Sequence, residues 1–527
     1  MKSKFSTGIF RLAAVSLVFL GGSRVMAQEP APDIALPEIT LDNGELYEPP
    51  QLEERPAEEL SPNDPEDNPE DVPHGSSEDE SGNEPVFETG FAPAEVVETP
   101  LEELQRNFFL YKEALDNDAN AEADAYAKRV VELSIEIFGI DSLDSARALT
   151  NLGIAQHHNE EYEAALLNYS AAIDIIERTE DRLNANLVNP LKGLGAAQLA
   201  AGRPDEAIES FDRAVHVSHV NEGPHNLMQV EVLQSLSETY LAVGEPGMAE
   251  TIQDHVFQLQ ARDVDFGSVD ILPVLENQAL WQNRLQLYEK ERYTWRKVID
   301  VIEDHYGKED LRLIPPLTKL GRSHLFVGAS DMSFHQPTSI STGEIYLKRA
   351  LRIAEGNPDS TWRTREEAML ALGDFYIMSG KPNRARGIYE DAWQLLSVDE
   401  ERLENRRDHL ESLIVLQKIN PPKYVGIDGE VRSQLPGENY EVGTIVYDYT
   451  VNTRGFTADI ELSEATPSGF DAMEQAVLRD LRAMIHRPRL DNGTPVTTEG
   501  LTYTHKFFYR ASDLPSTVEP SDVAATN

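Results

Sequence analysis

Three short stretches of this chain carry residue types that could bind a ligand. Residues 192–202 (KGLGAAQLAAG) contain the G-x-G of a nucleotide-binding turn, and His157-His158 precede two glutamates that could ligate a metal. Residues 116–127 (DNDANAEADAYA) begin like a calcium-binding loop. Two of these patterns lack a required part, because no strand precedes the G-x-G and the loop has Ala121 and Ala127 where Gly and Glu are needed.

Helix packing and solvated turns explain these stretches better than chemistry does. The two histidines lie at an expected bend between two helices, where polar residues are common. The sequence contains no nucleophile elbow, zinc-protease motif or P-loop, and the absence of cysteine excludes disulfides, thiolate zinc sites and cysteine nucleophiles. We therefore expect no catalytic activity, metal, cofactor or small-molecule substrate.

A pair made of a large and a small residue recurs along the chain and indicates the elements around these stretches. The small member stands at Gly153, Gly195, Ser237, Ala279, Gly321 and Gly373, at intervals of 42, 42, 42, 42 and 52 residues. The longer interval contains a ten-residue insertion within residues 328–343, which are rich in Ser, Pro and Gly. A constant period of this length is typical of stacked pairs of antiparallel helices.

The residues around these pairs resemble the tetratricopeptide repeat (TPR) family. The positions that carry the resemblance in the first two repeats are Leu149, Leu152, Gly153, Ala165, Tyr169 and Ala172, then Leu191, Leu194, Gly195, Ala207, Phe211 and Ala214. The period exceeds the usual 34 residues by eight, which predicts about one extra turn for each helix. The resemblance covers residues 101–418, includes a degenerate pair at residues 101–138, and implies a right-handed α-solenoid that binds proteins.

TPR partners usually lie along the concave face that the first helix of each pair builds. The resemblance places these residues on that face: Arg147, Thr150, Ile154, His158, Asn189, Lys192, Arg322, Leu325 and Phe326. The basic residues among them could receive a carboxylate or an acidic peptide. The alternative is that all are ordinary solvated helix positions.

After residue 419 the pattern changes from helices to strands. Alternating residues predict strands at residues 444–452, 456–465 and 501–510. Between the second and third strands, Phe470, Met473, Val477, Leu481 and Met484 have helical spacing. The chain is therefore predicted to be mainly α, with a small β-β-α-β domain of the α+β class at residues 421–510.

This domain resembles the C-terminal domain of the TonB family, the energy transducers of Gram-negative envelopes. The resemblance lies in the hairpin at residues 443–455, in Ala476 and Arg479 of the helix, and in the R-P-x-x-x-x-G-x-P-V segment at residues 487–496. The Tyr-Pro motif that usually precedes the hairpin is missing, because Val425 follows Tyr424. The resemblance therefore supports the fold more than the transducing activity.

In that family the last strand lies near the sheet edge and pairs with a short extended segment of an outer-membrane receptor. The resemblance implies such strand addition here, with backbone hydrogen bonds providing the affinity. The corresponding residues are Leu501, Thr502, Tyr503, Thr504, His505, Lys506 and Phe507. Half of their side chains must pack on the helix instead, because alternate residues of a strand face opposite sides.

Residues 1–27 have the features of a secretory signal peptide. Lys2, Lys4 and Arg11 accompany an apolar core at residues 12–22, and residues 25–27 suit cleavage before Gln28. The alternative is an uncleaved membrane anchor. Residues 28–100 are rich in Asp, Glu and Pro and contain Arg55 as their single Arg or Lys, so they are expected to form a disordered linker. Residues 511–527 are expected to form a disordered tail.

The net charge is −46, from 46 basic and 92 acidic residues, which disfavours binding to nucleic acid or anionic lipid. The sequence therefore predicts a periplasmic adaptor with protein partners in the cell envelope, including a TonB-dependent outer-membrane receptor. Two alternatives remain open. One is a membrane-anchored, TonB-type energy transducer for outer-membrane transport, and the other is a self-assembling envelope scaffold.

Overall fold

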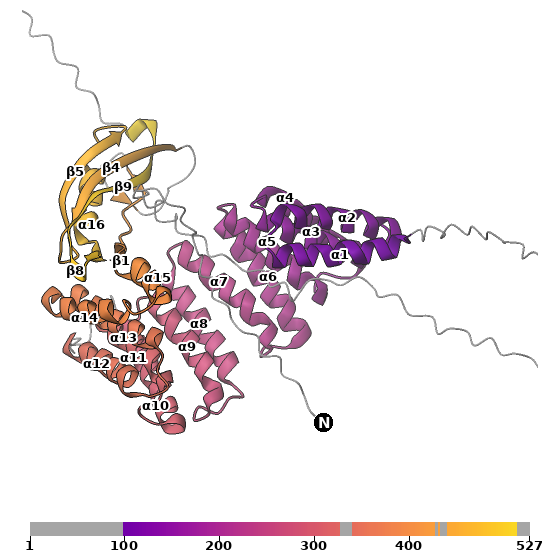
Figure 1. Cartoon of the computed structure of the whole chain (residues 1–527). Helices are drawn as coiled ribbons and strands as arrows, with labels where there is room; N and C mark the ends of the chain where they lie inside the picture. Colours follow the sequence, from indigo (N-terminus) through magenta and orange to yellow (C-terminus); the bar gives the residue numbers. More distant parts are fainter. Residues whose placement is uncertain (1–97, 327–339, 427–430, 433–439, 514–527) are drawn as a thin grey trace, which may run out of the picture. The chain divides into compact units, whose positions relative to one another are not determined.

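The computed structural model describes residues 98–326, 340–426, 431–432 and 440–513 (Figure 1). The expected signal peptide, nearly all of the acidic linker, most of the insertion and the tail beyond residue 513 lie outside the described residues. The described chain forms two compact units, one of residues 98–262 and the other of residues 263–513. Within these ranges, no helix is both long enough and apolar enough to cross a bilayer.

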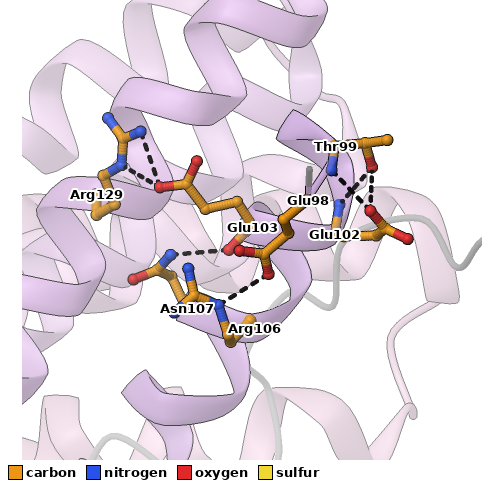
Figure 2. A network of polar contacts seen from close by, with 7 residues as sticks. All are labelled: Glu98, Thr99, Glu102, Glu103, Arg106, Asn107 and Arg129. Carbon is orange, nitrogen blue, oxygen red and sulfur yellow. Dashed lines mark hydrogen bonds and ion pairs between the residues drawn. The ribbon is translucent and has the colours of Figure 1, made fainter. Parts of the chain in front are cut away.

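The first helix, α1 (Pro100–Asp116), begins at a capping box (Figure 2). The Thr99 hydroxyl accepts a hydrogen bond from the Glu102 amide at 3.3 Å, and the Glu102 carboxylate accepts one from the Thr99 amide at 2.7 Å. Pro100 suits the first helical position because it has no amide hydrogen to satisfy there. Arg129 of the second helix contacts Glu103 at 2.9 Å and joins this turn to its neighbour. The helical part therefore starts at a defined residue.

The unit of residues 98–262 is a stack of antiparallel helix pairs. The pairs are α1 with α2 (Asn120–Phe138), α3 (Leu143–His158) with α4 (Tyr162–Thr179), α5 (Val188–Ala200) with α6 (Pro204–Glu222), and α7 (Val230–Ala242) with α8 (Pro246–Ala261). The first helices also contact one another, α3 with α5 and α5 with α7, which places them on the inner side of the stack. The helix pairs predicted from the 42-residue spacing are present, together with the degenerate pair that precedes them.

Close approach of the helices explains the small residue in each repeat. A Cβ atom at Gly195 would lie 2.7 Å from the Phe211 ring, and a Cβ atom at Gly153 would lie 2.7 Å from the Tyr169 ring. Both rings are fully buried, and Gly193 faces the same Tyr169 ring. The G-x-G at residues 193–195 is therefore a packing feature of α5.

A short 3-10 helix precedes the first helix of several pairs and accounts for part of the long period. These helices are η2 (Ala185–Leu187), η3 (Leu227–Gln229), η4 (Val269–Ile271) and η5 (Leu311–Leu313). The residue before each of them accepts a backbone hydrogen bond through its side chain, and these residues are Asn184, Asn226, Ser268 and Asp310. The expectation of one extra turn in each helix is thus corrected, because part of the added length forms these capped turns.

The unit of residues 263–513 contains further helix pairs and the C-terminal strands. Its helices are α9 (Leu272–Arg284) with α10 (Tyr288–Tyr306), α11 (Ile314–Ser323) with α12 (Ile340–Gly356), α13 (Trp362–Met378) with α14 (Pro382–Leu395), and the single α15 (Glu400–His409). The packing rule of the other unit holds here, since Gly373 lies against the buried ring of Tyr389. Both units are therefore TPR-like in their helical part.

A five-stranded sheet packs on one helix in the C-terminal module, residues 414–513. The sheet has the order β3–β2–β9–β4–β5, with β2 (Tyr424–Val425), β3 (Val431–Arg432), β4 (Glu441–Val451), β5 (Thr457–Thr466) and β9 (Thr498–Tyr509). Helix α16 (Asp471–Ala483) covers one face through Met473, Val477 and Leu481. The predicted β-β-α-β order is present as β4, β5, α16 and β9.

Two more strand pairs lie beside this sheet. Strand β1 (Ile414–Gln417) pairs with β6 (Ile485–Arg487), and β7 (Leu490–Asp491) pairs with β8 (Thr494–Pro495). The last helix ends at His409, so the helical part is shorter than the predicted range to residue 418. A strand suits this segment because alternate residues serve different cores: Val415 packs on the module and Leu416 packs on the helices.

Replacing Gly195 by Ala tests the packing rule. The added methyl group would push against the Phe211 ring, so we expect a loss of about 1–3 kcal/mol in the free energy of unfolding. Gly387→Ala is the matched control, because it lies within α14 with no atom within 4 Å of its Cβ position, and Ala favours helix. Equal stability of the two variants in urea denaturation would contradict the packing rule.

Candidate functional site

Strand β9 lies between two strands, which corrects the expectation of an edge strand. On one side it pairs with β4 along nearly its whole length, from Thr498↔Val451 to Tyr509↔Glu441. On the other side β2 contributes a single pair, Tyr424↔Phe508. Among the described residues, no strand pairs with residues 498–507 on this second side. We call this side of residues 498–507 the open flank of β9.

Backbone alternation shows which amides face the open flank. The Phe508 amide donates a hydrogen bond to the Lys423 carbonyl at 2.6 Å, on the β2 side. Alternate residues of a strand point the same way, so the amides of Thr502, Thr504 and Lys506 face the same side. Two prolines, at residues 421 and 422, precede β2 and cannot donate to a strand ladder, so β2 does not extend along the flank.

The side chains of β9 divide between the core and the opposite face. Leu501, His505 and Phe507 are buried and Tyr503 is half-buried, all on the side of α16. The other face carries Thr502 and Thr504, which are half-buried, and Lys506, which is exposed. Of the residues predicted for strand addition, therefore, Thr502, Thr504 and Lys506 can select an added strand by their side chains. The side chains of the other four residues, Leu501, Tyr503, His505 and Phe507, face α16 and do not reach an added strand.

The opposite edge of the sheet is built differently. Strand β5 carries the exposed acidic side chains of Asp459, Glu461 and Glu464, and its pairing with β4 is interrupted by two register shifts. Asp459 also has a positive φ of 47°, which bends the strand locally. Charged side chains and irregular pairing are common means of blocking an edge strand. The open flank of β9 is thus the better template for an incoming strand.

The predicted groove residues are divided between the two units. In the first unit Thr150, Ile154 and Lys192 are buried, and Lys192 Nζ lies 2.9 Å from Glu231 Oε2. Arg147, His158 and Asn189 are half-buried there, and Arg147 donates a hydrogen bond to Asn186 Oδ1 at 2.9 Å. In the second unit Arg322 is exposed, Leu325 is half-buried, and Phe326 stacks on Tyr288 with ring centroids 5.3 Å apart. Most of this face is thus engaged in the fold.

A buried ion pair joins the last helix pair to the C-terminal module. Arg487 of β6 donates two hydrogen bonds to the Asp374 carboxylate of α13, each at 2.8 Å. The Tyr389 hydroxyl donates to Asp374 Oδ1 at 2.8 Å, and Arg487 also donates to the His409 carbonyl at 2.8 Å. Burial opposes charge on Arg487, but Asp374 outweighs it and raises the guanidinium pKa. The guanidinium is therefore charged, and each of its three nitrogens donates a hydrogen bond.

No sequence pattern predicted this contact between the last repeat and the module. Asp374 follows Gly373 as Ile154 follows Gly153 and Arg322 follows Gly321, so it occupies a groove position. Arg487 belongs to the R-P-x-x-x-x-G-x-P-V segment, which carried the resemblance to TonB domains and predicted nothing about the helices. The module thus fills the groove position of the last repeat with its own arginine.

Apolar contacts surround the ion pair and close the joint. Leu410 and Leu490 are buried in one cluster with Phe375 of α13, and Leu416 packs against it. The Leu490 amide donates to the Leu410 carbonyl at 2.7 Å. The last repeat and the module therefore share a core, and within this unit they form one packed body.

Burial shifts the pKa of two histidines, the buried His486 and the half-buried His157. Burial lowers the pKa of His486 to about 4, and burial together with the neighbouring His158 lowers the pKa of His157 to about 4. Both imidazoles are neutral at pH 7, and His486 lies beside Tyr449 in the module. No group of three or more His, Asp or Glu side chains in the described ranges is placed to hold a metal ion.

No family model matches this sequence, and no curated protein matches it. Solved structures similar to it include kinesin light chain TPR-like repeats from Podosopora anserina (16% identity, 38% of this chain and 95% of that chain, TM-score 0.34). A second is BtubC (BKLC) from P. vanneervenii (17% identity, 46% of this chain and 94% of that chain, TM-score 0.34). A third is a TPR repeat-containing protein from Cytophaga hutchinsonii (12% identity, 57% of this chain and 98% of that chain, TM-score 0.35). Likenesses of this size carry no argument about function, and the TPR-like solenoid rests on the helix pairs and glycine–ring contacts described above.

Removing one partner of the joint leaves the other charge buried. We expect Arg487→Leu and Asp374→Leu each to lower the free energy of unfolding of the full chain by roughly 3–5 kcal/mol. The double variant should lose less than the sum of the two, because no lone charge remains. Arg363→Leu is the control, since Arg363 pairs with Glu401 at an exposed site and should change stability by about 1 kcal/mol or less. Strict additivity of the two joint substitutions in urea denaturation would contradict this account.

Acid should destabilise the module through His486. Its folded pKa of about 4 lies below the value near 6.5 of an unfolded histidine, so the unfolded state binds more protons between these values. The contribution of neutral His486 to the free energy of unfolding is therefore fully present above about pH 6.5, and it falls as the pH drops towards 4. His486→Phe should reduce this loss by on the order of 1–3 kcal/mol. Parallel stability–pH curves for the variant and the native chain would rule out this role.

Proposed function

We propose that this chain is a periplasmic, non-enzymatic adaptor that binds one envelope protein on its solenoid and captures an extended segment of another on the open flank of β9. The observation that carries the proposal is the set of amides at Thr502, Thr504 and Lys506 that face the open flank, where, among the described residues, β2 pairs with β9 only at Phe508. Unpaired strand amides are the usual template for β-strand addition.

The TonB-like features of the sequence support this mode of binding. The hairpin with its T-V-N-x-x-G turn, the following helix and the Arg487-Pro488 segment match the family in which a receptor segment pairs with the last strand. The signal-like residues 1–27 support export to the periplasm, where the periplasmic end of an outer-membrane receptor would be accessible. A TonB-dependent receptor is therefore the proposed source of the added strand.

The open flank also suggests what the added segment must contain. An incoming strand needs backbone amides and carbonyls at alternate positions, so proline is excluded at the residues that pair with Thr502 and Thr504. Lys506 is exposed on the face away from α16, so an acidic side chain on that face of the partner would be favoured. The segment is thus short, extended, free of proline and acidic near one end.

Thr504→Pro should weaken capture without breaking the sheet. The substitution removes an amide that faces the open flank. The hydrogen bonds to β4 are made by the alternate residues, such as Tyr503 and His505, and stay in place. The loss of one hydrogen bond, about 1 kcal/mol, corresponds to roughly a fivefold weaker complex. The measurement is quantitative crosslinking from Lys506 to envelope proteins from a Gram-negative extract, with the crosslinked receptor peptide identified by mass spectrometry.

Thr504→Val is the matched control, because it keeps the amide and the shape of the side chain. The proposal requires one and the same receptor peptide with the native chain and with Thr504→Val, and a reduced yield with Thr504→Pro at an unchanged melting temperature. An equal yield from all three chains would refute strand addition at this flank. A purified mature chain that retains Met1 would favour the anchored transducer over the adaptor.

A further inference from the structure

Three cations converge on one carboxylate at the turn between α13 and α14. Glu344 of α12 is contacted by Lys348 Nζ at 2.8 Å, Lys381 Nζ at 2.9 Å and Arg384 Nη1 at 2.9 Å. The Tyr376 hydroxyl donates to the same carboxylate at 3.2 Å. We call Lys348, Lys381 and Arg384 the cationic cluster.

The cluster carries more positive charge than its carboxylate can neutralise. Burial alone would raise the pKa of Glu344, but the hydrogen bonds and charges of Lys348 and Lys381 outweigh it and lower this pKa to about 2. Glu344 is therefore fixed at one negative charge, against three positive ones. No other carboxylate among the described residues forms an ion pair with Lys348, Lys381 or Arg384.

The excess charge faces solvent while the carboxylate does not. The side chains of Lys348 and Arg384 are 54% and 58% exposed, compared with 12% for Glu344. Two other arginines of this unit each pair with one carboxylate, Arg349 with Glu303 and Arg363 with Glu401. A carboxylate-rich ligand can thus contact Lys348 and Arg384 without displacing Glu344.

The chain itself contains a segment of the required chemistry. Residues 28–97 hold Arg55 as their single Arg or Lys and include the stretch SPNDPEDNPEDVP at residues 61–73. We propose that this acidic segment docks on the cationic cluster of the same molecule. Because the segment and the cluster belong to one chain, a tether long enough to join them raises the effective concentration of the segment, so that weak and salt-sensitive ion pairs suffice.

Zero-length carbodiimide crosslinking of the full mature chain tests the proposal. The reagent joins lysine amines to carboxylates in direct contact, and the products are mapped by mass spectrometry at low protein concentration. We expect links from Lys348 or Lys381 to Asp or Glu of residues 28–97, and at least a fivefold lower yield in 0.5 M NaCl. Links from these lysines to Glu344 alone would overturn the proposal.

Two sets of substitutions make the test specific. Lys348→Gln with Arg384→Gln should abolish the remaining links from Lys381, while Glu344 keeps Lys381 as its partner. Neutralising Glu66, Asp67, Glu70 and Asp71 to the corresponding amides should lower the total yield of links to residues 28–97 without any change in the helices. Arg363→Gln is the matched control and should leave the yield unchanged.

A mixture of ¹⁵N-labelled and unlabelled chains identifies the donor of the segment. Links within one isotope support docking in the same molecule. Links predominantly between isotopes would overturn it, because a second copy would then be the donor.

Discussion

The buried pair of Arg487 and Asp374 is the constraint on which the arrangement of the second unit depends. Two charges in an apolar joint are tolerated only when both are hydrogen-bonded, and here Tyr389 and the His409 carbonyl provide the remaining partners. Since these four residues come from α13, α14, α15 and β6, the pair holds together elements that are far apart in sequence. A terminal repeat would otherwise expose its packing face, and the module covers that face as a cap.

The helix pairs could be read from the sequence because their determinants are local. A glycine and the aromatic ring above it, such as Gly195 and Phe211, belong to one helix pair and recur with the repeat. The joint could not be read in this way, because Asp374 and Arg487 are 113 residues apart and occur once. A single aspartate at a groove position does not indicate whether its carboxylate contacts solvent, a partner protein or an arginine of the same chain.

The neighbours of strand β9 could not be predicted from the sequence, for a different reason. Its alternation of apolar and polar residues is the same in a central strand and in an edge strand, so the pattern predicted the strand and its buried face but not its neighbours. What decides the neighbour is β2, which is two residues long and has Pro421 and Pro422 before it. These prolines end the ladder early, and a strand that is central by topology keeps an open flank along most of its length.

The joint also bears on how the two proposed binding surfaces work together. Because Arg487 occupies the groove position at Asp374, the proposed partner of the solenoid would bind at other positions, such as that of the exposed Arg322. In the proposed adaptor, a segment captured by β9 and a ligand held near Arg322 would both lie on one packed unit, that of residues 263–513. In a rigid body, binding at one surface fixes the position of the other, which is the property an adaptor needs to bring two partners into a defined register.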